Sequence, residues 1–155
     1  MGTVTRRGGA GGHTPHVPAT NLEIVRSIYA HWRRGDFSSA DWADPAIEYI
    51  TVGGPEPGRW IGLDGMAAGW RGWLAGWTNF RAEPEDYLVL DADRILALVH
   101  NSAIGRTSGL ELEQHSVANL FELRGGKVVR LVIYLERELA FADLGLTAQD
   151  LPQAR

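Results

Sequence analysis

Residues Gly126 to Leu146 read GKVVRLVIYLERELAFADLGL, and the pattern changes once along this run. Lys127 to Glu136 is rich in β-branched and aromatic side chains and follows a Gly-Gly pair, which is typical of a strand that leaves a tight turn. Leu139 to Leu146 then predicts a short helix. The run is therefore expected to form a sheet strand followed directly by a closing helix.

Three further strand-like runs precede this strand along the chain. They span residues 80–90, 94–106 and 110–123. Three residues separate each run from the next, and connections of that length join antiparallel neighbours in hairpins. The second half of the chain is therefore expected to form an antiparallel meander.

The first ordered element is expected to begin at Thr20, because Thr20-Asn21-Leu22-Glu23 has the capping-box spacing. Gly35 is expected to end this helix in the left-handed conformation. Between them, apolar side chains recur every three or four residues and predict a buried stripe. They are Leu22, Val25, Ile28, Tyr29 and Trp32.

Between this helix and the meander, the sequence predicts a short weak helix, a lone strand, a loop and a longer helix. These are expected at residues 38–42, 46–52, 53–58 and 63–77, respectively. Four glycines in the longer helix each cost up to about 1 kcal/mol, so tertiary packing must hold it. One face carries the side chains expected to pack: Met66, Trp70, Trp73 and Trp77. The whole order is α+β, with helices on one face of a curved sheet.

The composition limits the classes of protein to consider. With 155 residues and 45% hydrophobic side chains, the chain can bury one core but has no room for a second domain. The net charge is −4 and both signs are scattered, so no nucleic-acid partner is expected. No apolar run approaches the roughly 18 residues of a membrane span, so no membrane partner is expected. The absence of cysteine fits a reducing, cytoplasmic location.

The chain is expected to divide into three regions. Residues 1–19 are rich in glycine and proline, hold hardly any large apolar side chain, and are expected to be a disordered leader. Residues 20–146 are expected to form the domain, and residues 147–155 a polar tail.

Four sequence segments each correspond to a particular position in the predicted fold. They are WRRGD from Trp32, DPAIEYITVGGPEPG from Asp44, GWRGWLAGW from Gly69 and the run from Gly126 quoted above. With the order of elements, they resemble the SnoaL-like group of nuclear-transport-factor-2-like proteins, which includes polyketide cyclases and ketosteroid isomerases. The resemblance implies a cone-shaped, curved antiparallel sheet with packed N-terminal helices around a pocket for a small hydrophobic molecule. It also implies a homodimer and chemistry without a cofactor.

Matching the final strand, the end of the first helix at Gly35 and the lone strand to those of the ketosteroid isomerases implies places for several pocket residues. Asn119 falls where those enzymes keep a protonated aspartate of the oxyanion hole, with His115 four residues upstream. Tyr29 lies beside the position of their oxyanion tyrosine, and Ile50 stands at the place of their general-base aspartate. The pocket wall is then expected to comprise Trp32, Ile50, Met66, Trp70, Trp73, Leu131, Ile133 and Leu135.

Four residues are candidates for catalysis. A near-neutral imidazole at His115 can transfer a proton at working pH. Glu48 is two residues from Ile50, so both side chains are expected on the same face of the strand. On the pocket side, an apolar wall would raise the pKa of Glu48 and make it a base. Asn119 and Tyr29 can steady a carbonyl or enolate oxygen. Each also has a purely structural interpretation, as a satisfied polar group, an exposed charge or a core aromatic.

Two functions fit these residues. The first is a cofactor-independent isomerase or cyclase that uses general acid and base chemistry in a dry pocket. The second is a non-catalytic module that binds an apolar small molecule or dimerises through the outer sheet face. No metal site is expected, because the five histidines show no ligand spacing.

Overall fold

The structure, a computed structural model, describes residues 19–151. The expected leader, apart from Ala19, lies outside the described residues, as does the end of the expected tail from residue 152. In chain order the elements are α1 (Asn21–Trp32), β1 (Ala43–Val52), β2 (Gly58–Ile61), α2 (Gly62–Leu74), β3 (Trp77–Val89), β4 (Arg94–Gly105), β5 (Glu111–Arg124), β6 (Lys127–Tyr134) and α3 (Arg137–Leu144). The predicted α+β class is confirmed.

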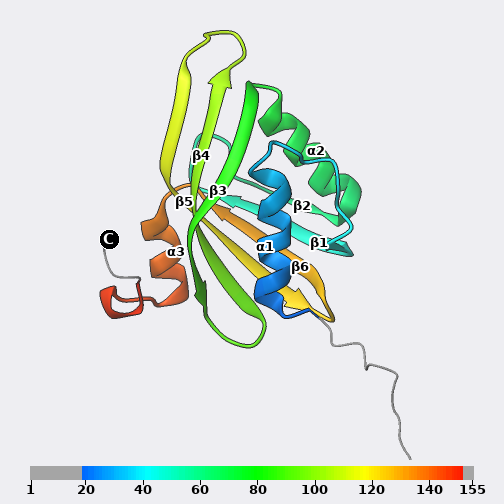
Figure 1. Ribbon diagram of the computed structural model, residues 1–155, viewed down its shortest axis with the longest axis vertical. Helices are drawn as coiled ribbons and strands as arrows, with labels where there is room; N and C mark the ends of the chain where they lie inside the picture. The colour runs from blue at the N-terminus through cyan, green and yellow to red at the C-terminus, as the bar shows by residue number, and fades with distance from the viewer. Residues whose placement is uncertain (1–18, 152–155) are drawn as a thin grey trace, which may run out of the picture.

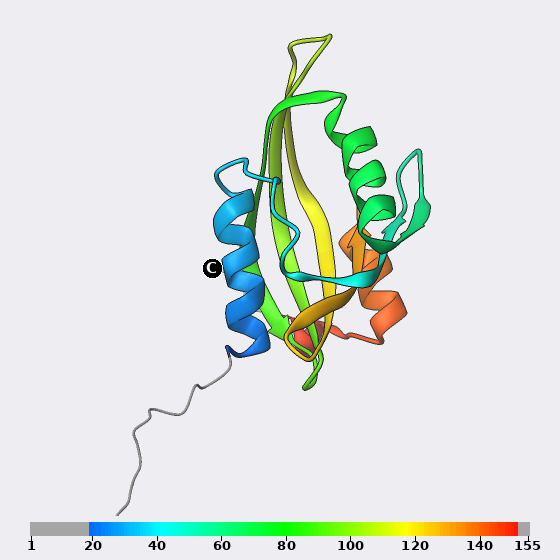
Figure 2. The same cartoon turned by 90° about the vertical axis from the view of Figure 1, so that its right-hand side faces the viewer.

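The strands form one sheet in the order β2-β1-β6-β5-β4-β3. All neighbours in this order are antiparallel except β1 and β6, which run parallel. The expected antiparallel sheet is therefore mixed, because most of the domain, rather than a hairpin, connects β1 to β6. Figures 1 and 2 show that the sheet is strongly bent, so that one half of the long strands β3 to β5 runs at a steep angle to β1 and β6.

The two faces of the sheet bury separate apolar cores. α1 and α2 contribute to one core, in which Tyr29 and Phe121 are completely buried. α3 contributes to the other core, with Leu120 and Ala140. Figure 1 shows α3 on the opposite side of the strands from α2. Because successive strand residues point to opposite faces, the neighbours Leu120 and Phe121 belong to different cores.

α1 begins where the sequence predicts. The backbone N–H of Glu23 donates to the Thr20 hydroxyl at 3.1 Å, and the N–H of Thr20 donates to the Glu23 carboxylate at 2.8 Å, which completes the capping box. Gly35 has the expected left-handed conformation, with φ of 79°, although the helix itself ends at Trp32. The buried stripe of α1 brings Tyr29 and Trp32 against the sheet.

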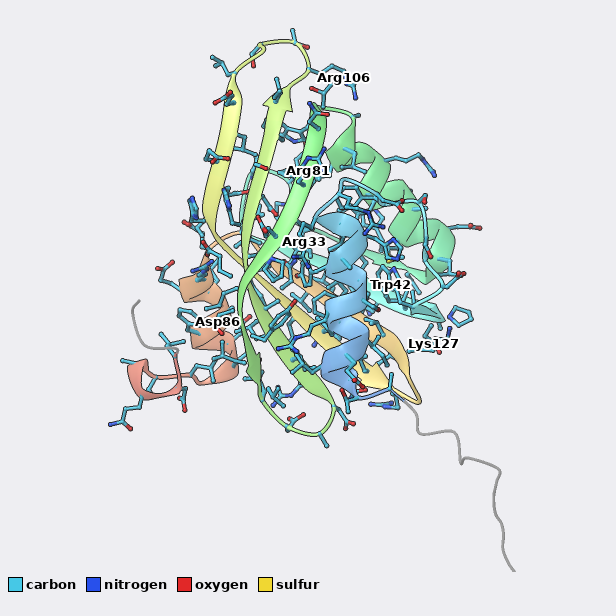
Figure 3. All side chains as sticks on the ribbon, viewed as in Figure 1. Arg33, Trp42, Arg81, Asp86, Arg106 and Lys127 are labelled. Atoms are coloured by element: carbon cyan, nitrogen blue, oxygen red, sulfur yellow. The ribbon has the colours of Figure 1, made fainter. Side chains whose placement is uncertain are left out.

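α2 ends earlier than predicted, at Leu74, and Trp77 begins β3 instead of extending the helix. Gly76, two residues after Leu74, disfavours further helix. In a longer helix, the backbone carbonyl groups of Ala75 and Trp77 would accept hydrogen bonds from within the helix. Here they accept from the Arg106 side chain instead, at 3.0 Å and 2.9 Å. Figure 3 shows Arg106 where β3 meets the end of α2. The prediction that Trp77 lies on the helix face is therefore wrong.

The predicted short helix at residues 38–42 is also wrong, since that part of the described chain is a loop and turn. The Asp36 carboxylate accepts hydrogen bonds from the backbone N–H of Ser38 at 3.1 Å and from its hydroxyl at 2.6 Å. Such side-chain bonds to nearby backbone compete with helix formation. The segment ends with the Trp42 indole N–H donating to the Ser39 carbonyl at 3.0 Å.

One strand was missed by the sequence analysis, and one terminal segment packs more than its composition predicts. β2 follows the glycine-rich loop and pairs antiparallel with β1, with Tyr49 opposite Trp60. After α3, a single 3-10 turn at Ala148–Asp150 follows. Leu146 and Leu151 flank this turn and pack against the α3 core, so this part of the expected polar tail is anchored by apolar contacts.

The glycines of α2 have different surroundings, and this gives a matched pair of variants. A Cβ at Gly69 would lie 2.9 Å from the Trp60 ring and 3.1 Å from the Tyr49 ring, whereas nothing lies within 4 Å of a Cβ at Gly72. We expect Gly69→Ala to lower the free energy of unfolding by about 1–3 kcal/mol. We expect Gly72→Ala to raise it by about 0.5–1 kcal/mol, since alanine favours helix. Urea denaturation measures both; equal effects would contradict close packing of Trp60 on α2.

Candidate functional site

A cavity of about 420 Å³ lies between α2, the end of α1 and the sheet. β1, β2, β3, β4 and β5 each contribute a side chain to its lining, as does the segment from β6 into the following turn. Aromatic rings form much of the wall, namely Trp32, Tyr49, Trp60, Trp70, Trp73 and Phe80. The sequence therefore concentrates its tryptophans around one space.

The rings of this wall pack on one another and fix its shape. Tyr49 stacks on Trp70 with ring centroids 5.7 Å apart and an interplanar angle of 17°. The ring centroid of Trp60, on β2, lies 5.4 Å from that of Tyr49, and the ring centroid of Trp32, on α1, lies 5.3 Å from that of Trp70. Because aromatic rings in mutual contact have few alternative rotamers, the wall is preformed.

Two buried amides face this aromatic space. Asn119 is 4% exposed and Asn101 is 6% exposed, and both line the cavity. The Nδ2 of Asn119 donates to the Tyr29 hydroxyl at 2.8 Å, and the Nδ2 of Asn101 donates to the Gln114 side chain at 3.5 Å. The Oδ1 atom of each has no hydrogen-bond partner within the described chain. A buried acceptor without a partner is costly, so both oxygens are available to a ligand.

Tyr29 lies behind Asn119 and does not line the cavity. Its side chain is completely buried, with its ring 5.7 Å from that of Phe121 and 5.2 Å from that of Trp32. Burial raises the pKa of Tyr29 well above its ordinary value, against the smaller lowering effect of the hydrogen bond from Asn119. Tyr29 is therefore neutral at any working pH and acts on the cavity indirectly, by positioning Asn119 and packing against Trp32.

The loop at the edge of the cavity supplies its carboxylate. Gly53 and Gly54 adopt φ of 85° and 75°, which turns the chain back after β1. The N–H of Gly58 donates to the Thr51 hydroxyl at 2.9 Å and closes the loop. Glu56 and its two flanking prolines line the cavity, and Glu56 is exposed. The loop thus holds one negative charge at an entrance to an otherwise aromatic space.

A family model of the SnoaL-like domain matches residues 25–131, which is more than half of the chain. The chain belongs to the SnoaL-like family. The predicted resemblance is confirmed, and the residues that build the cavity from α1 to β6 fall largely within the matched range. No curated protein matches this SnoaL-like chain.

Solved structures show the same fold as this SnoaL-like protein. TerC co-crystallised with polyporic acid has a TM-score of 0.64 and 19% identity, covering 80% of this chain and 96% of its own. An NTF2-like protein from Burkholderia thailandensis has a TM-score of 0.66 and 22% identity, with 83% and 99% covered. A putative SnoaL-like polyketide cyclase from Mesorhizobium loti has a TM-score of 0.59 and 13% identity, with 75% and 99% covered. The nuclear-transport-factor-2-like fold is thereby confirmed.

The SnoaL-like structure places His115 away from the cavity, because β5 contains a bulge. Residue 99 pairs with 117, but residue 101 pairs with 114, so β5 has one extra residue between these pairs. An extra residue reverses which side chains point to which face. His115 consequently does not share the face of Asn119, and the prediction that it lies on the pocket wall is wrong.

His115 instead belongs to a charged group elsewhere on the sheet. Its side chain is 60% exposed, its Nδ1 lies 3.1 Å from the Glu85 carboxylate, and its ring stacks on His100 with centroids 4.0 Å apart. Partial burial acts to raise the pKa of Glu85, but hydrogen bonds and charge from Arg137 and His115 outweigh it and hold that pKa below its ordinary value. This group is an ion-pair network outside the cavity.

Glu48 and Ile50 also point away from the cavity. The side chain of Tyr49, between them, is 3% exposed and lines the space, so its two neighbours lie on the other sheet face. Glu48 pairs with Arg130 at 3.1 Å and with Arg59, and Ile50 packs against the α3 core. The inward facing predicted for Glu48 and Ile50 is therefore wrong.

The remaining predicted wall residues divide between the cavity and its surroundings. Leu131 is completely buried in the core and Met66 lines a second cavity of about 260 Å³, which shares Trp32 and Trp70 with the first. The residues of the prediction that do line the main cavity are Trp32, Trp70, Trp73, Ile133 and Leu135. Sequence reasoning missed Tyr49, Trp60, Asn101 and Glu56.

The described residues hold no group of three or more His, Cys, Asp or Glu side chains that could bind a metal ion. Within residues 19–151, no helix is long and apolar enough to cross a membrane.

Proposed function

We propose that this SnoaL-like protein binds a flat, largely apolar small molecule in the aromatic cavity, with one polar group of the ligand bonded to Asn119. The observation that carries this proposal is an amide side chain, 4% exposed, whose Oδ1 lacks a partner and which lines the cavity. A ligand that supplies the missing hydrogen bond removes a cost of about 1–3 kcal/mol.

The shape of the site supports the same proposal. A volume of about 420 Å³ lies in the range of small-molecule pockets, about 300–1,000 Å³, which are mainly apolar with a few polar groups. Flat ligands can also stack on the exposed parts of the aromatic wall, which adds about 0.5–1.5 kcal/mol per ring pair. TerC, which has the same fold, was co-crystallised with the small molecule polyporic acid.

Binding without catalysis is favoured over the isomerase or cyclase function. The two bases considered from the sequence, His115 and Glu48, lie outside the cavity. Burial raises the pKa of Tyr49 well above its ordinary value, so this phenol stays protonated and is no base at working pH. Without a positioned base in the cavity interior, proton transfer from an apolar ligand is slow.

Glu56 gives the isomerase or cyclase function its one specific support. It lines the same cavity as Asn119, and a carboxylate can act as the base that takes a proton from a carbon next to a carbonyl. In that case Glu56→Gln would abolish turnover but keep ligand binding. The expected homodimer stays a prediction alongside either function.

The binding proposal is tested by fluorescence titration of the cavity tryptophans with a panel of flat aromatic phenols and anilines, which carry a hydrogen-bond donor for Asn119 Oδ1. We expect saturable quenching with at least one member. Gly72→Phe is the blocking variant, because Gly72 lines the cavity and nothing lies within 4 Å of a Cβ there, so a larger side chain is tolerated on the helix and narrows the cavity. The variant is expected to stay folded and lose binding. Unchanged binding in Gly72→Phe, or no binding by any member to the parent, would contradict the proposal.

A further inference from the structure

The charge of the cavity lining has one sign. Among the described lining residues, Glu56 carries the single charged side chain, and no lysine or arginine reaches the cavity wall. The two fully buried side-chain atoms of the lining that lack a hydrogen-bond partner, Oδ1 of Asn101 and Oδ1 of Asn119, are both acceptors. The faces of tryptophan and tyrosine rings are also negative, because of the ring quadrupole. The carboxylate, the two amide oxygens and the ring faces all favour a positive ligand.

The arginines of the neighbouring elements have other partners and do not line the cavity. Arg106 donates to the carbonyl groups of Ala75 and Trp77. Arg81 donates to the carbonyl of Arg33 at 3.2 Å. Figure 3 shows Arg33 and Arg81 together at the end of α1, and Arg106 near the end of α2. On the far face of the sheet, Arg59 and Arg130 pair with the carboxylate of Glu48.

We propose that the ligand of this cavity is an organic cation, an ammonium group carried on an aromatic body. The ammonium lies near Glu56 and over the aromatic wall, because cations are attracted to tryptophan and tyrosine faces and a cleft of one charge sign concentrates the opposite sign. The body of the ligand fills the interior and donates a hydrogen bond to Asn119. This inference rests on the proposed binding function and specifies its ligand class.

The test compares two ligands of the same shape that differ only in charge. (4-Hydroxyphenyl)trimethylammonium and 4-tert-butylphenol have the same skeleton, with a cationic nitrogen in one and a neutral carbon in the other. Both carry a hydroxyl that can donate to Asn119. We expect the cation to bind about tenfold more tightly in tryptophan-fluorescence titrations at pH 7 and low salt, and to lose part of this advantage in 1 M NaCl.

Two carboxylate variants separate the local effect of Glu56 from the net charge. Glu56→Gln is expected to weaken binding of the cation about three- to tenfold and leave binding of the phenol unchanged. Glu138→Gln, on the exposed surface of α3, makes the same change in net charge and is expected to alter neither. Equal affinities for the two ligands, or equal effects of the two variants, would overturn the inference but leave the proposed binding function standing. Binding of neither ligand, with a neutral panel member bound, would also overturn it, and no binding of any kind would overturn both.

Discussion

Replacing Asn119 with leucine is expected to weaken ligand binding by about tenfold to a hundredfold, because the ligand loses its buried polar partner. The same change leaves the completely buried hydroxyl of Tyr29 without the hydrogen bond that Asn119 Nδ2 donates at 2.8 Å. We therefore expect Asn119→Leu to lower the free energy of unfolding by about 1–3 kcal/mol.

A second substitution separates binding from stability. When Tyr29→Phe is added, both polar partners are replaced by apolar groups of similar shape, a change that is nearly neutral in buried sites. The double variant is expected to recover most of the lost stability but none of the lost affinity. Urea denaturation and fluorescence titration of the parent, both single variants and the double variant complete the cycle. Parental affinity in the double variant would show that Asn119 does not contact the ligand.

The Phe121→Ala variant is expected to have the largest effect on stability. Phe121 is completely buried on β5, and its ring packs against Tyr29 at 5.7 Å and Trp32 at 6.2 Å. Removing a buried phenyl ring leaves a void between α1 and the sheet, and such changes cost about 3–5 kcal/mol. The midpoint of urea denaturation is expected to fall accordingly.

A surface leucine provides the control for this prediction. Leu110 is 72% exposed at the β4–β5 connection, so Leu110→Ala is expected to change the free energy of unfolding by less than about 0.5 kcal/mol. A loss below about 1 kcal/mol for Phe121→Ala would mean that α1 does not pack on β5 as described.

The sequence predicted elements best where a local pattern determines them. The capping box at Thr20 and Glu23 fixes the start of α1 through bonds between residues three apart, so sequence alone identifies it. The meander strands follow from short connections between apolar runs. Trp77 was misassigned because its helical spacing continues that of Trp73, while the contact that ends the helix comes from Arg106, distant in the chain.

The candidate site was less predictable, because a single bulge reverses which residues of a strand point to which face of the sheet. His115 and Asn119 are four residues apart and would share a face in a regular strand, but the extra residue in β5 separates them. Polar residues surround His115 and give no sign of that bulge. For β1, by contrast, the sequence did indicate the facing of the side chains. Apolar Ile47 and Tyr49 alternate with Glu48, which favours the first two for the buried face, and Tyr49 is the residue that lines the cavity.

The side-chain amide NMR signals of Asn119 provide the most direct test of the central claim that a ligand binds beside this residue in the aromatic cavity. Titration with a ligand that quenches the tryptophans is expected to shift the two Asn119 Nδ2 proton signals saturably, with the same dissociation constant as the quenching. The amide of Asn21, which donates to the Ala92 carbonyl at 2.8 Å on the exposed surface, serves as the internal reference and should not move. Asn119 signals that stay in place while the ligand saturates the protein would contradict the claim.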